Sequence, residues 1–435
     1  MDDSASRPPE RPKLRLLDVV RVVDSHHGLV TVVRDGEGIG ESVVVPPPLD
    51  RLLELLDGRR TVEQVATLAS RSSGRVVSTE QVAVLVLVLH RAFLLDDPRH
   101  AKRRLELEAE FSRAEVRTAV HAGTAYHADP IKLRAFITSD CMAAATKSGV
   151  AADPTPATHE AVALIAPHMD LWRAARGYGH AYGALASGLP DGADTFLLLG
   201  TCHAGMRAPF ALTTKTFETP LGPLVCDREI AKSLAAHTRF DVFSDEYQHK
   251  AEHSIEFQAV FLRHLLGHER ARDARVVPIL CGLGRAQARR SDPVSDLEAE
   301  SFVSKLADLV AARGDRVVVI AGADLSHMGP RFGDPSALDE SEREALHARD
   351  GESLERALEG DALGFFEHTT SDLDERRVCG VGPIYTLLRL LPALGQTASR
   401  LLHYAQHVDP DEGSIVSHAS ASFVRRTRPR PVSYP

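Results

Sequence analysis

The chain has 435 residues, 43% of them hydrophobic, which is enough for two or three domains with buried cores. Its 60 acidic and 51 basic residues give a net charge of −9, which argues against a nucleic-acid-binding protein because such proteins usually carry a basic face. No run of 18 apolar residues occurs, so we expect no membrane span. The N-terminus lacks a signal-peptide layout and the five cysteines form no CxxC pair, so we expect a cytoplasmic protein with reduced thiols.

The first part of the chain has the pattern of a small separate domain. Residues 1–14 are polar and contain prolines, so we expect a disordered tail there. Within residues 15–97, two β-prone runs at 29–33 and 42–45 flank a glycine-rich segment. This arrangement predicts a β-hairpin.

Helix signals follow the hairpin. A short helix is predicted over 49–56, because an Asp-Gly pair ends that apolar stretch. Thr61 with Gln64, and Ser78 with Gln81, have the spacing of a capping box ahead of an apolar run. Two strands with three short helices indicate a winged-helix-like domain.

The rest of the chain predicts an α/β domain. Residues 98–115 are strongly charged and are expected to form a solvated helical connector. Between 116 and 425, strand-like runs alternate with amphipathic stretches such as 299–313 and 339–358. That alternation predicts a mostly parallel sheet flanked by helices on both faces, and residues 426–435 are expected to be a tail.

Reactive side chains follow four apolar, β-prone runs in this region, at the point where each run ends. They are His168, His203, Cys281, and Asp324 with His327, after the runs 162–166, 196–200, 276–280 and 317–321. In open α/β sheets, ligands bind beyond the carboxyl ends of the strands. The pattern therefore predicts an enzyme-like metal pocket at that edge.

Several unusual sequence blocks occur in order across this region. They are RTAVHAGTAY (117–126), IAPH (165–168), LGTCH (199–203), EHSIE (252–256), ADLSHMG (323–329), VCGVGPI (378–384), YAQ (404–406) and SIVS (414–417). Together they resemble the Memo family, whose bacterial members are known as AmmeMemoRadiSam system protein B. The EHSIE block and the Cys-Gly-x-x-Pro-Ile block are the most specific.

The resemblance implies a fold and a ligand set. The Memo fold is similar to that of class III extradiol dioxygenases, which hold ferrous iron with two histidines and a glutamate, and in Memo proteins a cysteine replaces the carboxylate. The implied ligands are His168, His203 and Cys379. Two imidazoles and a thiolate suit Fe(II), Cu or Zn, and leave positions open for water, O2 or substrate. We expect Fe(II); a blue-copper site would also need a weak axial ligand, which the sequence does not identify.

Four further residues have implied supporting roles. His253 and His327 match family histidines that handle protons near the substrate in the dioxygenases, and an imidazole suits that task. Asp324 is expected to orient an imidazole, with an ordinary ion pair at a strand end as the alternative. If 251–266 is a helix, Glu256 shares a face with His253 and either takes part in the site or only braces the pocket.

The sequence departs from the family pattern at several pocket positions. Met169-Asp170-Leu171 stands where many members have Ala-Gly-Tyr, and Ala204 where they have a second histidine. Gln258 and Gly382 also replace histidines of the family blocks. The implied ligands are kept while the polar lining is reduced, so metal binding is expected more firmly than turnover.

Residues 52–61 look like PqqD-type peptide-recognition domains, which are associated with radical SAM enzymes. A DNA-binding winged helix is the structural rival, but this segment has no concentrated basic helix. A structural cap on the larger domain is a third interpretation. A radical SAM protein and a peptide substrate are therefore the expected partners, with no nucleic acid and no membrane.

Two functions from different classes are compatible with these features. The first is a non-haem metal-dependent oxidoreductase, a dioxygenase or oxidase acting on an organic or peptide substrate. The second is a non-catalytic protein that binds metal or peptide in a degenerate dioxygenase-like pocket. Zinc-dependent hydrolysis is a third option, because a His2Cys site can activate water.

Overall fold

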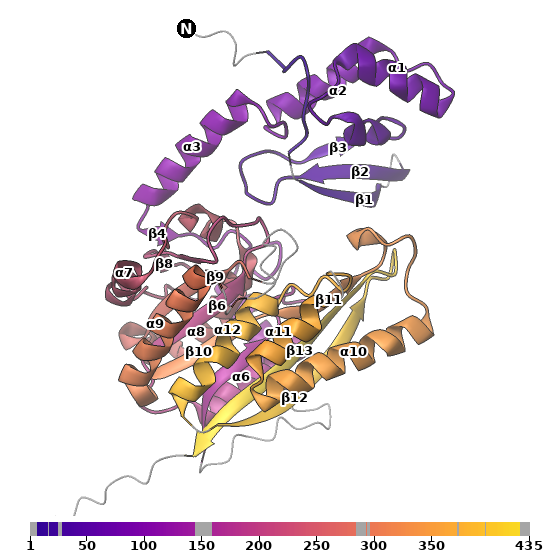
Figure 1. Ribbon diagram of the computed structural model, residues 1–435. Coiled ribbons are helices and arrows are strands. Elements are labelled where there is room, and N and C mark those ends of the chain that lie inside the picture. Colours follow the sequence, from indigo (N-terminus) through magenta and orange to yellow (C-terminus); the bar gives the residue numbers. More distant parts are fainter. Residues whose placement is uncertain are drawn as a thin grey trace, which may run out of the picture. The chain divides into compact units, whose positions relative to one another are not determined.

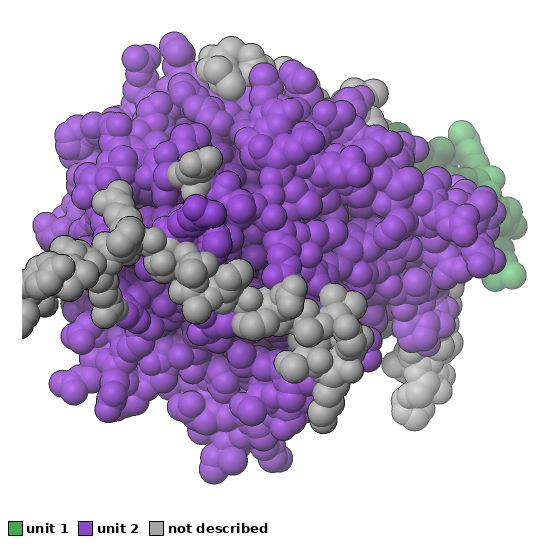
Figure 2. Space-filling model, turned by 90° about the horizontal axis from the view of Figure 1, so that it is seen from below, with its two compact units in different colours: residues 1–114 green, residues 115–435 purple. Residues whose placement is uncertain are grey.

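The computed structural model describes residues 7–15, 17–24, 28–143, 159–283, 293, 296–371, 374–395 and 397–426. The chain divides into two compact units, residues 1–114 and 115–435, which Figure 2 shows in different colours. The division falls at the end of the expected helical connector. Residues 1–6 and 427–435, which belong to the expected tails, lie outside the described residues.

The first unit contains an antiparallel sheet of three strands, β1 (Asp18–Asp24), β2 (Gly28–Arg34) and β3 (Val43–Val45). The predicted hairpin of β2 and β3 is confirmed, with Val32 opposite Val44. In its glycine-rich turn, the Asp35 carboxylate accepts hydrogen bonds from three backbone N–H groups. The sequence analysis missed β1, because its valines occur in adjacent pairs and so lack the period-two alternation of a half-buried strand.

Helices complete this unit. They are the 3₁₀ helix η2 (Leu49–Leu55), α1 (Val62–Ser73), α2 (Thr79–Arg91) and α3 (Pro98–Arg113). Both predicted capping boxes are present, at Thr61 with Gln64 and at Ser78 with Gln81. Apolar residues of β2, β3, η2, α1 and α2 form one buried cluster, so this unit has its own core.

The second unit is built on a mixed sheet (Figure 1). Among the described residues, eight strands lie in the order β11-β13-β5-β10-β6-β9-β7, with β12 paired to β13. They are β5 (His159–Ala166), β6 (Thr195–Thr201), β7 (Phe210–Leu212), β9 (Arg275–Cys281), β10 (Val317–Gly322), β11 (Asp324–Met328), β12 (Ala398–Val408) and β13 (Ile415–Arg426). A further pair, β4 (Val116–Arg117) and β8 (Thr216–Phe217), lies apart from this sheet.

The predicted parallel sheet is present at the centre of this unit. Strands β5, β10, β6 and β9 are parallel. At one end β7 pairs antiparallel with β9, and at the other β13 pairs antiparallel with β5. The last strand, β11, pairs antiparallel with β13 and so runs in the direction of the central strands. The sheet is thus mixed, and its antiparallel hairpin β12–β13 was not foreseen. Most β12 side chains are half-buried, which leaves only a weak alternating signal in the sequence.

Helices cover both faces of the sheet, as expected (Figure 1). Helices α6 and α8 pack on one face, and α12 packs on the other with α9 and α11 against it. The helices are α4 (Pro130–Phe136), α6 (Ala175–Gly188), α7 (Arg228–His237), α8 (His253–Asp273), α9 (Leu297–Arg313), α10 (Glu340–Glu359), α11 (Ala362–Thr370) and α12 (Val381–Leu394). Strand residues alternate between two cores: Leu197 packs with α12 residues, and Leu198 packs with α8 residues.

Two glycines let the first turn of α8 approach the sheet closely. A Cβ at Gly200 on β6 would lie 2.5 Å from the Ser254 Oγ, and one at Gly322 on β10 would lie 2.5 Å from the Ser254 carbonyl oxygen. The Ser254 hydroxyl donates to the Thr201 carbonyl at 2.8 Å. The start of α8 therefore lies at the carboxyl ends of the parallel strands. None of the helices in the described part of the chain is both long and apolar enough to cross a membrane.

Candidate metal centre

His168 lies two residues after the end of β5 and is buried. Its Nδ1 lies 2.9 Å from the Gly322 carbonyl oxygen at the end of β10. A carbonyl only accepts hydrogen bonds, so Nδ1 carries the proton and Nε2 keeps its lone pair. Its backbone N–H donates to the Asp324 carboxylate at 3.0 Å. Gly322 thus holds the ring and Asp324 holds the backbone of His168, and the Nε2 lone pair can bind a metal ion.

His203 lies two residues after the end of β6 and is half-buried. Its Nδ1 lies 3.0 and 3.1 Å from the two carboxylate oxygens of Glu252, and its backbone N–H donates to the same carboxylate at 2.8 Å. The His203 and His168 ring centroids are 5.0 Å apart at an angle of 77°.

His253 is the first residue of α8. Its ring stacks on His203, with centroids 4.6 Å apart at 20°, and meets His168 edge-on at 5.4 Å. Its Nδ1 lies 3.3 Å from the Glu252 carboxylate. The sequence analysis considered 251–266 as a helix only conditionally, and α8 covers His253–Asp273. This helix brings His253 to the strand ends through the close approach at Gly200.

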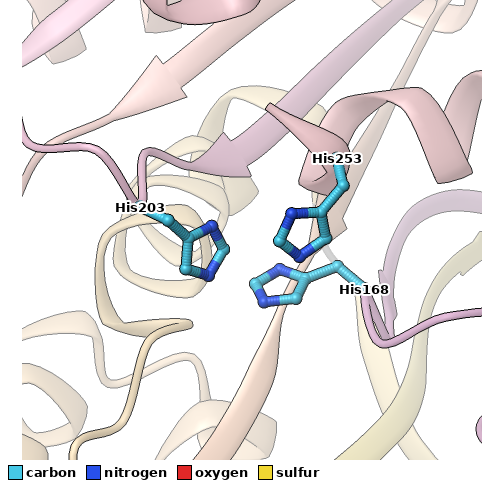
Figure 3. Close-up of side chains that lie close together, drawn as sticks. All are labelled: His168, His203 and His253. Atoms are coloured by element: carbon cyan, nitrogen blue, oxygen red, sulfur yellow. The ribbon is translucent and has the colours of Figure 1, made fainter. Parts of the chain in front are cut away.

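These three imidazoles form the group best suited to a metal among the described residues. One ligand atom from each of His168, His203 and His253 lies within 4.8 Å of the others. Figure 3 shows the rings turned toward one another from two strand ends and a helix start. Imidazole nitrogen is a common ligand for Zn, Cu, Fe and Ni, so this group can hold a transition metal ion.

The electrostatics of the group favour neutral imidazoles. Burial, with the charges of the neighbouring imidazoles, lowers the pKa of His168 well below its usual value. Burial likewise lowers the pKa of His253 to about 3, although Glu252 opposes this. For Glu252, burial alone would raise the pKa, but His203 and His253 lower it well below the usual range. Burial thus favours the neutral form of His168 and His253, and a metal ion binds the neutral form of an imidazole.

Cys379 and Asp324, both expected at the site, lie beside His168. The Cys379 Sγ is 3.1 Å from the His168 Nε2, although Cys379 is not part of the three-histidine group. Asp324 contacts His168 through a backbone hydrogen bond, with an oxygen also 3.7 Å from the ring Nε2. Burial raises the pKa of Asp324 to about 7, opposed by the hydrogen bond from His168. Asp324 was expected to orient an imidazole, and the imidazole that it contacts is that of His168.

His327 and Glu256 are not part of the three-histidine group either. The His327 ring packs edge-on against Phe332 at 5.1 Å, and its Nδ1 lies 3.0 Å from the Leu325 carbonyl. The buried Glu256 pairs with Arg117 and accepts hydrogen bonds from the Tyr126 hydroxyl and the His121 backbone. Glu256 therefore braces the segment that precedes α4.

Glu252 was not selected as a site residue from the sequence. It caps the N-terminus of α8, and its carboxylate contacts two of the three histidines. A carboxylate just before a helix is commonly only a cap, so the signal available was its place beside His253 in the EHSIE block. His121, with its ring 5.8 Å from that of His253, was missed as well.

Comparisons with known proteins identify the family. A family model described as Memo-like protein matches residues 117–422. A MEMO1 family protein of Aquifex aeolicus is 28% identical over 413 residues, which cover 95% of this chain and all of that relative. A MEMO1 family protein of Methanosarcina acetivorans is 32% identical over 267 residues, covering 60% of this chain and 85% of the relative. A solved structure of an uncharacterized Escherichia coli K12 protein matches with 16% identity and a TM-score of 0.32, covering 60% of this chain and 99% of that chain.

The matched segment includes all the residues of the candidate centre. The family model begins near the start of the second unit, whereas the Aquifex relative aligns with 413 of the 435 residues and so extends into the first unit. The matched segment is also well over half of the chain. This chain belongs to the Memo-like protein family.

Proposed function

We propose that this protein binds one transition metal ion and uses it in the oxidation of an organic or peptide substrate by O2. The observation that carries the proposal is the group of His168, His203 and His253 at the carboxyl ends of the parallel strands. Ligand sites in open α/β sheets lie at this edge, and burial lowers the pKa of His168 and His253, which favours their neutral form. Fe(II) is the metal we favour, with Cu or Zn as alternatives.

The donor set fits a metal with redox chemistry. His168 and His203 are common to the two candidate sets, and the third ligand is either His253 or Cys379. The Cys379 Sγ, 3.1 Å from the His168 Nε2, is close enough to replace or join His253 after a small rotation of its side chain. Bound Fe(II) or Cu would supply one-electron and O2 chemistry, whereas Zn would supply only Lewis acidity.

Proton handling is assigned to Asp324 and His327. The Asp324 carboxyl, with a pKa of about 7, can hold or release a proton near neutral pH, and it lies beside His168. The half-buried His327 lies on the same strand, β11, and an imidazole can act as a general acid or base. Both roles predict a pH dependence of turnover.

Two features of the pocket favour the alternative of a non-catalytic metal- or peptide-binding protein. The buried Gln258, at a histidine position of the family, donates to the Pro167 carbonyl and accepts from the Tyr182 hydroxyl, so its amide acts in packing. A Cβ at Gly382 would lie 3.0 Å from the Cys281 Cβ, so the backbone there leaves little room for a side chain. Both departures remove titratable groups from the pocket.

We also propose two partners for this protein, a peptide substrate and a radical SAM protein. The likeness of residues 52–61 to PqqD-type domains suggests that the first unit recruits a peptide, with a radical SAM protein acting in the same system. The short β3 is an edge strand of its sheet, and strand addition is a common mode of peptide recognition. Capture of a radical SAM protein by the full chain, lost when residues 1–97 are removed, would support this.

Oxygen uptake tests the proposal. The protein would be purified without oxygen, loaded in parallel with Fe(II), Cu or Zn, and mixed with candidate organic and peptide substrates. Substrate-dependent O2 uptake with Fe(II) or Cu, lost in His168→Ala, is the expected result. Tight metal binding without uptake would favour the binding protein, and stoichiometric zinc with hydrolysis would replace the oxidase proposal.

A further inference from the structure

Glu252 holds two of the three histidines with a single carboxylate. Its Oε2 accepts from the His203 backbone at 2.8 Å, and its Oε1 lies 3.0 Å from the His203 Nδ1. The same Oε1 accepts from the backbone N–H groups of His253 and Ser254 at 2.8 and 3.0 Å, and it lies 3.3 Å from the His253 Nδ1. Every one of these contacts joins the carboxylate to His203, two residues after the end of β6, or to the first turn of α8.

An ionised carboxylate only accepts hydrogen bonds, and this decides the tautomer of the facing rings. The His203 Nδ1 must carry its proton toward Glu252, which leaves the lone pair on Nε2. The His253 Nδ1 faces the same oxygen, so the same tautomer is favoured there. His168 reaches that state through the Gly322 carbonyl. All three rings are then in the tautomer whose Nε2 can bind a metal.

Glu252 is itself firmly held. It is 7% exposed, and its backbone carbonyl accepts a 2.7 Å hydrogen bond from the Arg117 guanidinium. Arg117 is fully buried and is paired with Glu256, which lies one helical turn further along α8. Gly200 provides the space in which the start of α8 reaches the end of β6. The carboxylate is therefore fixed before any metal arrives.

Helix capping alone does not account for this residue. Shorter Ser, Thr, Asp and Asn are the preferred N-cap residues, and Asp227 and Asp361 fill that place in α7 and α11. A shorter side chain would suffice to reach the N–H groups of His253 and Ser254. The longer Glu side chain also reaches the His203 ring and backbone.

We propose that Glu252 is the positioning residue of the metal centre, and that its carboxylate fixes the tautomer and orientation of His203 and His253 so that both present Nε2 to the ion. The inference rests on the proposed metal site. Partners of this kind commonly contribute 10- to 100-fold to metal affinity. Asp324, which contacts His168 mainly through the backbone, does not fill this role for the other two rings.

The test uses the full chain in four forms: wild type, Glu252→Ala, Glu252→Gln and Asp227→Ala. Asp227→Ala is the matched control, because it removes a helix cap that contacts no metal-centre histidine. The first measurement, on metal-free protein, is the tautomer of His203 by long-range ¹⁵N–¹H NMR of histidine-labelled samples at a pH where the ring is neutral. The second is the dissociation constant for Co(II).

We expect the Nδ1–H tautomer of His203 in the wild type and in Asp227→Ala, and its loss in Glu252→Ala together with about 10- to 100-fold weaker Co(II) binding. Glu252→Gln should recover part of both, because its amide oxygen still accepts a hydrogen bond from the Nδ1–H group, whereas its amide N–H₂ group can only donate. An unchanged tautomer, with Co(II) affinity within twofold of wild type, would reduce Glu252 to a helix cap. If the wild type binds no Co(II), the proposed function is wrong, and the tautomer alone then decides the role of Glu252.

Discussion

At the scale of single residues, Gln258 shows how a buried amide can support the candidate centre without being part of it. The Gln258 amide is fully buried and joins the Pro167 carbonyl, at 2.8 Å, to the Tyr182 hydroxyl, at 3.0 Å. Pro167 directly precedes His168, so this amide also fixes the backbone that carries one ring of the candidate metal centre. A residue that appears to be a loss of function in the sequence is thus a buried hydrogen-bonding link.

Gln258→Ala should destabilise the protein by about 2 to 4 kcal/mol, because two buried polar groups lose their partner and a cavity forms. Urea-induced unfolding of the two proteins measures the difference. A loss below about 0.5 kcal/mol would mean that water or a neighbouring group satisfies these atoms.

The sequence predicted part of the centre and missed the rest for identifiable reasons. His168 and His203 were found because each follows an apolar strand, and their rings do meet at the strand ends. His253 was assigned to proton transfer, yet its ring belongs to the group that can hold a metal. Glu252 was missed because no spacing rule distinguishes a helix cap from a carboxylate that also contacts an imidazole 49 residues away.

At the scale of elements, the site depends on how closely α8 approaches the sheet. A Cβ at Gly322 would lie 2.5 Å from the Ser254 backbone oxygen, which cannot rotate away as a side chain can. Helix and strand must therefore separate if this position carries a side chain. His253 lies in the same first turn of α8 and would move with it.

Gly322→Ala should cost about 1 to 3 kcal/mol of stability and weaken Co(II) binding, because overpacking shifts the backbone. Gly351→Ala is the control, since a Cβ at that helical position meets nothing within 4 Å. The control should be neutral or slightly stabilising. If the two variants have equal melting temperatures, the close contact between Gly322 and the first turn of α8 does not contribute to stability.

A second group of histidines lies between α6 and the β12–β13 hairpin. The His180 and His403 rings stack at 5.0 Å, and His403 lies 5.7 Å from His418. Burial, with the charges of His403, His407 and Arg173, lowers the pKa of His418 to about 3. Burial, with the charges of His180 and Arg176, lowers the pKa of His403 to about 4.

The lowered pKa values of His403 and His418 determine how the stability of the protein changes with pH. The fold keeps these rings neutral, whereas the unfolded chain binds protons below about pH 6.5. Their contribution to stability is therefore complete above pH 6.5 and is lost as the pH falls toward 4 and 3. Below pH 6.5, each ring that stays neutral in the fold lowers the free energy of unfolding by at most about 1.4 kcal/mol for each unit by which the pH falls.

Between pH 6.5 and 5, the free energy of unfolding should fall less steeply with pH in His418→Leu than in the wild type. The difference in slope should correspond to about one proton fewer taken up on unfolding. His268→Ala, at an exposed position on α8, should leave the slope as in the wild type. Urea midpoints collected across that range supply the comparison. Identical slopes for wild type and His418→Leu would show that His418 is protonated in the fold.

The elements themselves were predictable to different degrees. The amphipathic stretches 299–313 and 339–358 match α9 and α10 to within about two residues at each end, and the capping box at Thr61 marks the start of α1. The parallel centre of the sheet was also found, because fully buried strands form continuous apolar runs. The antiparallel ends were not, since β11 is short and polar and β12 is mostly half-buried.

At the scale of the whole molecule, the chain consists of two units with separate cores. All residues of the candidate centre belong to the second unit, residues 115–435, and the first unit has its own buried apolar cluster. The charged stretch at 98–115, expected as a connector between two domains, forms α3, which belongs to the first unit.

A protein shortened to residues 115–435 should therefore bind Co(II) with the affinity of the full chain, because no ligand or supporting carboxylate is removed. Calorimetric titration of the two proteins measures this directly. An affinity more than about tenfold weaker in the shortened protein would require a contribution of the first unit to the centre.

The central claim is that His168, His203 and His253, with Cys379 beside them, hold one metal ion. The most direct measurement is metal stoichiometry after anaerobic loading with Fe(II) and extensive dialysis, in the wild type beside His168→Ala, His253→Ala and Cys379→Ala. We predict close to one ion per chain in the wild type and almost none in His168→Ala, while the other two variants identify the third ligand. A metal-free wild type, or full occupancy in His168→Ala, would contradict the account.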